Sequence, residues 1–431
     1  MMKIKNFKEL AVNDQRKKIL SIAEAGLQSI DTKNTLKNLV KIKKGLLYIS
    51  EKQFVLKNIE KLIFIGVGKS AVESAVVFEN ILGNHITNGI VIDVKKGKKL
   101  KKISSFVGSH PLPSNQNIEI TKKILDILEG FTENDLVVFL ISGGGSTLLC
   151  LPAQAGQPKS GDAEKEISIV QALIKNGATI QEMNTVRKHL SLARGGWLAK
   201  YAYPAKVVSL IFSDVPGDDM TFIASGPTCK DETTINDAKN VLNKYKINVE
   251  GIDLIETPKE EKYFKNVKNV LALSNQTALE AMAIKAEELG LIAKIMTNKI
   301  IGEVYDASKI ILKDMRSLDK NEVLLYGGET TVKVRGVGRG GRNLQLGLLL
   351  LKNLKEDEIV LTVATDGRDN GPFGGAICDI ITKQDIGKKG LSLEESLKNN
   401  DSYPLFEKAG NYLMMGDTGS NVADLIIAMK F

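Results

Sequence analysis

The sequence is poor in cysteine, in aromatic residues and in long apolar runs, and each shortage excludes a class of protein. Its 431 residues hold only 3 cysteines, Cys150, Cys229 and Cys378, which are too few and too widely spaced for a disulfide framework or a zinc site. We therefore expect buried thiols in a reducing cytoplasm. Apolar runs stay below the roughly 18 residues that a membrane helix needs. The polar start MMKIKNFKELAVNDQRKK also lacks the apolar core of a secretory signal. The sequence thus predicts a cytoplasmic protein without a membrane partner.

Aromatic residues make up 5% of the chain, although Lys and Arg together exceed Asp and Glu by 59 to 51. A nucleic-acid-binding surface usually combines basic with aromatic residues. The hypothesis of a nucleic-acid-binding module therefore rests only on the net charge of +8, and we expect no nucleic-acid partner. Positive charge also steers anionic small molecules toward a protein.

Arginine is scarce, because only eight of the 59 basic residues are Arg. The planar guanidinium grips carboxylates and phosphates with two parallel hydrogen bonds, which an ammonium cannot do. Six arginines lie in glycine-rich or polar segments, which we interpret as a sign of anion chemistry: Arg187, Arg194, Arg335, Arg339, Arg342 and Arg368.

Short apolar strands alternate with helical segments along most of the chain. Strands that are almost continuously apolar are typical of parallel sheets covered on both faces, and we predict two α/β domains with mainly parallel sheets. Helical spacing over residues 14–50 predicts two amphipathic helices before the first such strand. A charged, irregular stretch at 228–265 suggests a boundary, so we expect domains at residues 1–235 and 236–431. We expect the active site in the cleft between them.

The strongest local motif is LISGGGSTLL, in which a glycine turn joins a strand to a helix. In open α/β sheets, ligands bind where strands end and helices begin. Consecutive glycines let several backbone N–H groups point at one anion. We therefore predict a nucleotide phosphate site in this turn, made of Ser142, Gly143, Gly144, Gly145 and Ser146.

The segment GVGKSA offers a second glycine turn that has two interpretations. Ile63 occupies the position of the first glycine of a Walker A loop, so the segment is not a P-loop. Gly66, Gly68 and Ala71 fit a loose dinucleotide fingerprint with Asp93 after the next strand, which supports a rival oxidoreductase. In either case Lys69 lies where an ammonium would meet a ligand phosphate; a solvated lysine at a helix start is the alternative.

Aspartates follow two other strands. Asp214, Asp218 and Asp219 come directly after a buried strand in SDVPGDD, and Asp366 and Asp369 flank Arg368 in TDGRDNG. Crowded carboxylates repel one another unless a cation or proton intervenes. Mg²⁺ held by one or two carboxylates and by substrate phosphates is the usual solution. We predict Asp214 and Asp218 as metal ligands, with helix capping as the alternative.

The remaining candidates are substrate contacts. Glu329 follows a strand in GGETT, and Arg342 lies in the glycine-rich GVGRGGRN, a pattern typical of an anion clamp. His110 in GSHPLPSNQN and Arg187 in NTVRKHLS are also predicted to contact substrate, although a structural histidine is the alternative for His110. Neither a GxSxG elbow nor an HExxH zinc motif occurs. Anion cradles, aspartates and a lysine favour phosphoryl transfer.

Together these segments resemble the glycerate 2-kinase family, whose C-terminal part is called the MOFRL domain. The matching stretches follow the family's order from about residue 15 to the C-terminus. They are GVGKSA, GSHPLPSNQN, LISGGGSTLLCLP, MNTVRKHLSLARGGWLA, SDVPGDDMTFIASGPT, LSNQTALEAM, GGETTVKVRGVGRGGRN, TDGRDNGPFGGAICD and GDTGSNVADL.

The resemblance implies a Rossmann-like glycerate kinase domain followed by a MOFRL-type α/β domain, with ATP and Mg²⁺ as cofactors. The implied reaction is phosphorylation of D-glycerate at its 2-hydroxyl, which gives 2-phosphoglycerate. The family's motif lysine falls on Lys69, its arginine on Arg342, and its aspartates on Asp214 and Asp366. Lys69 and Arg342 would stabilise the transferred phosphate or the substrate carboxylate. One of the two aspartates would accept the hydroxyl proton or hold Mg²⁺, and their assignment stays open.

Some members of the family are labelled hydroxypyruvate reductases. An NAD(P)H-dependent hydroxypyruvate reductase is therefore the alternative function, and it rests on the GxGxxA segment and Asp93. The sequence leaves open whether the chain forms a homo-oligomer.

Overall fold

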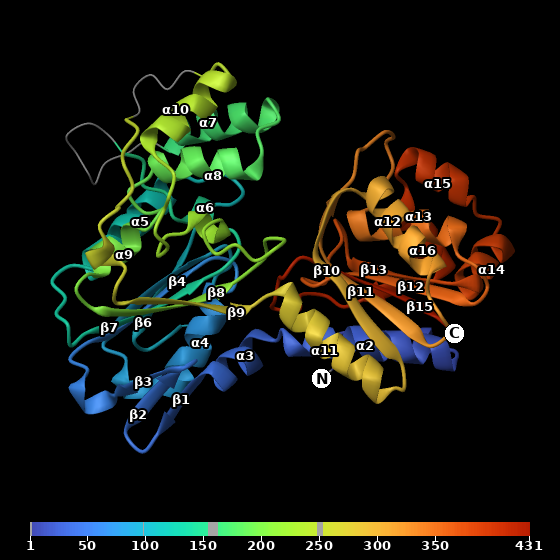
Figure 1. Ribbon diagram of the computed structural model, residues 1–431, viewed down its shortest axis with the longest axis horizontal. Coiled ribbons are helices and arrows are strands. Elements are labelled where there is room, and N and C mark those ends of the chain that lie inside the picture. Colours follow the sequence, from blue (N-terminus) through green and yellow to red (C-terminus); the bar gives the residue numbers. More distant parts are fainter. Residues whose placement is uncertain (1, 98, 154–162, 248–252) are drawn as a thin grey trace. The chain divides into compact units, whose positions relative to one another are not determined.

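The chain forms two compact units (Figure 1). The computed structural model describes residues 2–97, 99–153, 163–247 and 253–431. The N-unit comprises Thr32–Ser213 and Asp219–Ala272, and the C-unit comprises Met1–Asp31, Asp214–Asp218 and Leu273–Phe431. The domain boundary expected between residues 235 and 236 stays a prediction, because a compact unit need not coincide with a segment that folds alone. Residues 248–252 of the stretch that suggested it lie outside the described ranges.

The N-unit is built on a six-stranded sheet with the order β6-β5-β4-β7-β8-β9. Numbered within this sheet, the order is 3-2-1-4-5-6, which is found in doubly wound α/β sheets. The pairings of β4 with β5, β4 with β7, β5 with β6 and β7 with β8 are parallel, as the sequence predicts. The strands are Leu62–Val67 (β4), Asn88–Asp93 (β5), Ile103–Val107 (β6), Leu136–Ile141 (β7), Lys206–Phe212 (β8) and Val267–Leu273 (β9).

Every position of β4 and β7 is buried, which explains their unbroken apolar sequences. The helices of the N-unit are Thr32–Leu39 (α3), Ala71–Leu82 (α4), Asn115–Ile127 (α5), Gly145–Leu148 (α6), Ala163–Lys175 (α7), Ile180–His189 (α8), Trp197–Ala202 (α9) and Ile235–Lys244 (α10).

The prediction of two helices over residues 14–50 is right only as far as residue 39. The helices Asp14–Ser29 (α2) and α3 form, but Val40–Lys43 (β1), Leu46–Ile49 (β2) and Lys52–Val55 (β3) then form an antiparallel sheet. Lys44 and Gly45 both adopt positive φ, 49° and 76°, as the favoured two-residue hairpin turns require. The helical prediction missed this turn.

The C-unit contains a second six-stranded sheet with the order β10-β11-β15-β12-β13-β14. Here the expectation of mainly parallel pairing is wrong, because only β10 and β11 pair in parallel while the other four pairings are antiparallel. A short loop joins β12 to β13, which allows only antiparallel pairing, and the last strand β15 lies antiparallel between β11 and β12. The strands are Ile292–Glu303 (β10), Glu322–Thr331 (β11), Glu358–Ala364 (β12), Phe373–Cys378 (β13), Tyr412–Met414 (β14) and Asp424–Lys430 (β15).

Helices cover both faces of the C-unit sheet. α2 and α11 (Asn275–Glu288) pack together on one face, and α12 (Val304–Arg316) and α13 (Arg342–Asn353) pack on the other (Figure 1). The remaining helices are Phe7–Leu10 (α1), Ile380–Lys388 (α14), Leu393–Asn399 (α15) and Ser402–Ala409 (α16). Among the helices in the described ranges, none combines the length and apolarity needed to span a bilayer.

The three cysteines are free and buried, as the sequence predicts. Burial raises the pKa of the Cys229 thiol to about 12.

Candidate functional site

Two loops of the N-unit meet where the strand order of its sheet reverses. β4 and β7 are neighbours, yet the strands after β4 and those after β7 extend to opposite sides of the sheet. Ligands of doubly wound sheets bind at this point, outside the carboxyl ends of the strands. The loops that leave the two strands carry Lys69 and the predicted glycine turn Ser142–Ser146.

Backbone hydrogen bonds join these two loops directly. The amide of Lys69 donates to the carbonyl of Gly143 at 3.0 Å, and the amide of Ser142 donates to the carbonyl of Val67 at 2.8 Å. The amide of Ser70 donates to the Ser142 hydroxyl at 3.2 Å. The position of Lys69 is therefore fixed by the glycine turn itself.

Gly68 is required for this close approach. Its φ is +116°, and a Cβ at this position would lie 2.2 Å from Ser142 Oγ and 2.4 Å from the Ser142 carbonyl oxygen. Only a residue without a side chain allows the two loops to touch.

His110 joins the same cluster from the loop after β6. A Cβ on Gly144 would lie 3.3 Å from His110 Cδ2 and 3.4 Å from Lys69 Cε, so both side chains lie against the glycine turn. Burial, and then the charge of Lys69, lower the pKa of His110, which favours the neutral imidazole. The structure thus brings together Lys69, His110 and the turn, which are far apart in sequence.

A buried asparagine that the sequence analysis did not single out positions the His110 loop. Asn117 Oδ1 accepts from the amide of Ser109 at 2.8 Å, and its Nδ2 donates to the carbonyls of Ser109 and Thr147, each at 3.0 Å. Asn117 therefore links the residue before His110 to the helix that follows the glycine turn. Its place within GSHPLPSNQN was the available signal.

Ser146, at the end of the glycine turn, forms hydrogen bonds within the protein. Its hydroxyl lies 2.9 Å from that of Ser225, which donates to Asn184 Oδ1 at 2.7 Å. Asn184 lies on α8 and is buried. These bonds connect the turn to the helix that carries Arg187.

Arg187 has a different neighbourhood. Its carbonyl accepts from Nη1 of Arg194 at 3.4 Å, and burial and then the charge of Arg194 lower its pKa. Arg194 itself is fully buried and pairs with Glu166 at 2.7 Å. Arg194 is thus a structural residue, whereas the substrate contact of Arg187 stays a prediction.

Asp93, on which the oxidoreductase alternative rests, is occupied by the protein. The side chain is 2% exposed, and its oxygens accept from the amides of Val72, Val94 and Lys95 at 3.0, 2.6 and 3.2 Å. A dinucleotide site needs this carboxylate for the ribose hydroxyls. The geometry therefore disfavours such a site.

In the C-unit, Arg342 and Glu329 meet. Arg342 is the first residue of α13, and its Nη1 lies 2.7 Å from Glu329 Oε1. On its other side, Nε and Nη2 donate to the two carboxylate oxygens of Asp424 at 2.5 and 3.1 Å. Asp424 was not identified from the sequence; its occurrence in GDTGSNVADL was the only signal.

The two aspartates of the loop after β12, Asp366 and Asp369, have different surroundings. Asp369 is 4% exposed and accepts from the amides of Asn343 and Leu344 at 3.0 and 2.7 Å, so it caps α13. Burial raises the pKa of Asp369 to about 6. Asp366 is exposed and accepts from the amide of Arg368 at 3.0 Å.

A pocket of about 470 Å³ lies within the C-unit. The charged residues that line it are Glu329, Arg342, Arg368 and Asp369, together with glycines of the GVGRGGRN loop. The structure therefore gathers these predicted residues around one cavity.

Asp214 and Asp218 belong to the C-unit by their contacts. Asp218 has a φ of +58° and accepts from Asn298 Nδ2 at 3.4 Å. Within the described ranges, no group of three or more His, Cys, Asp or Glu side chains is arranged to hold a metal. Mg²⁺ commonly takes one or two carboxylates and completes its shell with phosphates and water, so a role for these aspartates stays a prediction.

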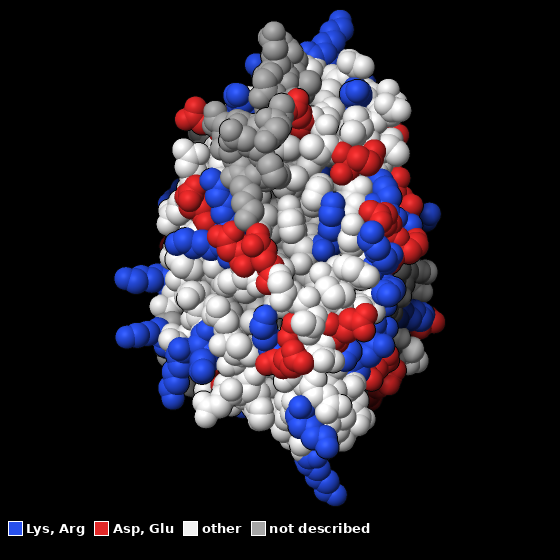
Figure 2. All heavy atoms as spheres, turned by 90° about the vertical axis from the view of Figure 1, so that its left-hand side faces the viewer, with Lys and Arg blue, Asp and Glu red and all other residues white. Residues whose placement is uncertain are grey.

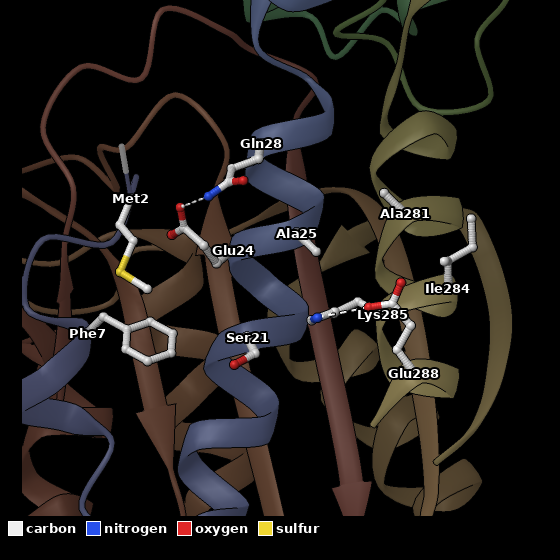
Figure 3. Close-up of a pocket in the computed structure, with 10 residues that line it drawn as sticks. All are labelled: Met2, Phe7, Ser21, Glu24, Ala25, Gln28, Ala281, Ile284, Lys285 and Glu288. Carbon is white, nitrogen blue, oxygen red and sulfur yellow. Dashed lines mark hydrogen bonds and ion pairs between the residues drawn. The ribbon is translucent and has the colours of Figure 1, made fainter. Parts of the chain in front are cut away.

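One further cavity and one face of the N-unit bear on the predicted functions. A cavity of about 350 Å³ is lined by residues of α2 and α11, including the ion pair Lys285–Glu288, and no predicted site residue lines it (Figure 3). On the face of the N-unit in Figure 2, acidic and basic side chains are interspersed. This face does not have the continuous basic surface that nucleic-acid binding requires.

Two family models match the chain: Domain of unknown function (DUF4147) over residues 18–254 and MOFRL family over residues 322–424. The chain is 39% identical over 391 residues to D-glycerate 2-kinase of Thermotoga maritima, which covers 86% of this chain and 91% of the relative. It is 36% identical over 436 residues to glycerate 2-kinase of Pyrococcus horikoshii, covering 95% and 96% of the two chains.

A solved structure agrees with these sequence matches. The crystal structure of glycerate kinase from Thermotoga maritima matches with a TM-score of 0.85 and 34% identity, covering 96% of this chain and 99% of that one. Some relatives carry the provisional name hydroxypyruvate reductase. The extent and identity of the matches show that the chain belongs to the glycerate 2-kinase family, in which a DUF4147 region precedes a MOFRL region.

Proposed function

We propose that the chain is a glycerate 2-kinase that uses ATP and Mg²⁺ to phosphorylate D-glycerate at its 2-hydroxyl. The observation that carries this proposal is the contact of Lys69 and His110 with the glycine turn at Gly144. A cation, a glycine turn and a switch point of a doubly wound sheet together form a site suited to a polyphosphate. The membership of the family supports the same reaction.

The N-unit residues would hold the nucleotide. In our proposal, the turn Ser142–Ser146 cradles phosphate oxygens, and the ammonium of Lys69 neutralises the charge that develops on the transferred phosphoryl group. His110 is held neutral beside Lys69, so it would donate or accept a hydrogen bond without adding charge.

The C-unit residues would hold the acceptor. A guanidinium has five N–H donors, and contacts with Asp424 and Glu329 use three of those of Arg342. Two donors remain for the glycerate carboxylate or the transferred phosphoryl group. One of Asp214 and Asp366 would accept the proton of the 2-hydroxyl as its oxygen bonds to the γ-phosphorus and ADP leaves.

Mg²⁺, when bound with ATP, would neutralise phosphate charge, and Asp214 and Asp218 are the carboxylates that we propose to hold it. Asn298 Nδ2 donates to one oxygen of Asp218 at 3.4 Å, and carboxylate oxygens such as those of Asp214 and Asp218 are the ligands that Mg²⁺ prefers. A cytoplasmic location is part of the proposal and fits the three free, buried thiols.

The experiment supplies D-glycerate, ATP and Mg²⁺ and follows ADP release, with ³¹P NMR to identify the phosphorylated hydroxyl. A parallel reaction supplies hydroxypyruvate and NADH. We expect 2-phosphoglycerate and an equal amount of ADP, with no consumption of NADH. NADH oxidation without ADP formation would overturn the proposal in favour of the reductase, and 3-phosphoglycerate would overturn the assigned hydroxyl.

A further inference from the structure

Arg342 is held from one side by a carboxylate that lies outside the pocket. Asp424 binds Nε and Nη2 of the guanidinium through both its oxygens, at 2.5 and 3.1 Å. The Asp424 side chain is 4% exposed, whereas that of Arg342 is 33% exposed. Arg342 lines the pocket of about 470 Å³, and Asp424 is not among the lining residues. The guanidinium thus connects a buried anion to an accessible cavity.

The backbone of Asp424 is itself fixed. It is the first residue of β15, which pairs with strands on both sides, so that Asp424 lies opposite Gly328 of β11 and Ala364 of β12. A side chain on the central strand of three paired strands has little freedom to follow a moving partner. Asp424 therefore holds Arg342 at a defined place on the sheet.

Stability alone does not explain this pair, because a buried ion pair adds little free energy of folding once the desolvation of its charges is included. The same unit offers a comparison. Arg16 and Asp379 form the same fork, with Nε and Nη2 each 2.7 Å from a carboxylate oxygen, and both side chains are buried. Neither residue lines the pocket, so this second pair serves as a comparison that does not touch it.

We infer that Asp424 is a positioning residue that orients Arg342, so that the two remaining guanidinium donors grip an anionic oxygen pair of the substrate. The carboxylate of glycerate and the transferred phosphoryl group share this chemistry. The inference rests on the proposed function. Glu329 holds Nη1 at the rim of the pocket, where its side chain is 41% exposed, so Asp424 is the partner that is anchored in the sheet.

Asp424→Asn tests the inference, with Asp379→Asn as the matched control. Both substitutions remove one charge from a buried fork in the same unit, and urea unfolding measures how much stability each one costs. We expect Asp424→Asn to lower kcat/KM for glycerate by on the order of 10²-fold, as a misplacement of about 1 Å does. Asp379→Asn should retain kcat/KM within about threefold. A rise in KM for glycerate would assign the contact of Arg342 to the glycerate carboxylate. A fall in kcat would assign it to the transferred phosphoryl group.

A double-mutant cycle separates positioning from a direct role. Arg342→Ala leaves Asp424 as an unpaired buried charge, so adding Asp424→Asn should restore part of the lost stability. The same addition should leave the low activity of Arg342→Ala unchanged, because there is no guanidinium left to orient. A further loss of activity of tenfold or more would show that Asp424 acts other than through Arg342.

Asp424→Glu keeps the charge but displaces the carboxylate by about one methylene, and it serves if Asp424→Asn does not fold. We expect at least a tenfold loss of kcat/KM in this variant. If the unaltered enzyme forms no ADP with glycerate, the proposed function fails and the positioning role with it. If the unaltered enzyme is active and Asp424→Asn or Asp424→Glu matches it, only the positioning role is overturned. Equal losses of activity in Asp424→Asn and Asp379→Asn would overturn it as well.

Discussion

Replacing Gly68 by alanine should separate the two loops that build the N-unit site. Gly68 has a φ of +116°, and an added Cβ would lie 2.4 Å from the Ser142 carbonyl oxygen and 2.7 Å from its carbonyl carbon. These are backbone atoms, which cannot rotate away as a flexible side chain would. The substitution must therefore move either the Lys69 loop or the glycine turn.

The size of the effect follows from these distances. An ordinary contact with a Cβ is at least 3.4 Å, so the loops must separate by about 1 Å. A displacement of this size at a catalytic group costs about 10²-fold in rate. The backbone strain of alanine at a glycine-only φ adds about 1–3 kcal/mol of lost stability. We therefore expect kcat/KM of Gly68→Ala to fall by on the order of 10²-fold.

The control is Gly130→Ala, which lies in the same unit, has a φ of +72° and meets no atom within 4 Å. It carries backbone strain without the overlap, so it should lose stability but keep its activity. The assays are ADP release with glycerate for kcat/KM and urea unfolding for stability. The reasoning would be refuted if Gly68→Ala kept kcat/KM within threefold of the unaltered enzyme, or if Gly130→Ala lost as much activity.

Three further outcomes are expected. Lys69→Ala should lower kcat/KM by on the order of 10²-fold or more, because it removes a charge positioned for the transition state. Lys57→Ala, at another exposed lysine of the N-unit, should change kcat/KM less than twofold. Equal effects of the two substitutions would show that Lys69 is not part of the site. Because burial raises the pKa of Asp369 to about 6, its ionisation is opposed in the folded state. The unfolding free energy should therefore fall by roughly 2 kcal/mol as the pH rises from 4 to 6, and Asp369→Asn should remove this part of the pH dependence. An unchanged pH dependence in that variant would show that Asp369 is not the group that titrates. Chelation of divalent cations should stop ADP formation and added Mg²⁺ should restore it, whereas undiminished turnover in a chelator would exclude a metal requirement.

The N-unit could be predicted from the sequence because its signals are local. β4 and β7 are short apolar runs with a glycine one or two residues after each, and this pattern predicts both the parallel strands and the loops at their ends. Once parallel strands are assigned, the loops at their carboxyl ends must share one edge of the sheet. The sequence alone therefore predicts that Lys69 and the glycine turn lie at the same edge of the sheet.

The C-unit was less predictable because its ordering contacts are not local. Asp424 meets Arg342 from 82 positions away, through a strand that inserts antiparallel into the middle of the sheet. The spacing of apolar and polar residues along the chain does not predict where such a strand inserts. Arginines in glycine-rich or polar segments were also ambiguous: Arg194 is fully buried against Glu166, because bidentate pairing suits internal carboxylates as well as ligands.

The groups that lie at the N-termini of α4, α13 and α6 indicate which glycine-rich segment is suited to bind phosphate. Asp93 accepts from the amide of Val72 in the first turn of α4, and Asp369 accepts from the first amides of α13. An internal carboxylate thus already accepts from first-turn amides of each of these helices, so these amides are not left for the nucleotide phosphates. The glycine turn before α6 has no side-chain cap and lies against Lys69, a cation. A phosphate bound at the turn would meet a positive charge, and this difference supports our proposal that Ser142–Ser146 hold the nucleotide phosphates.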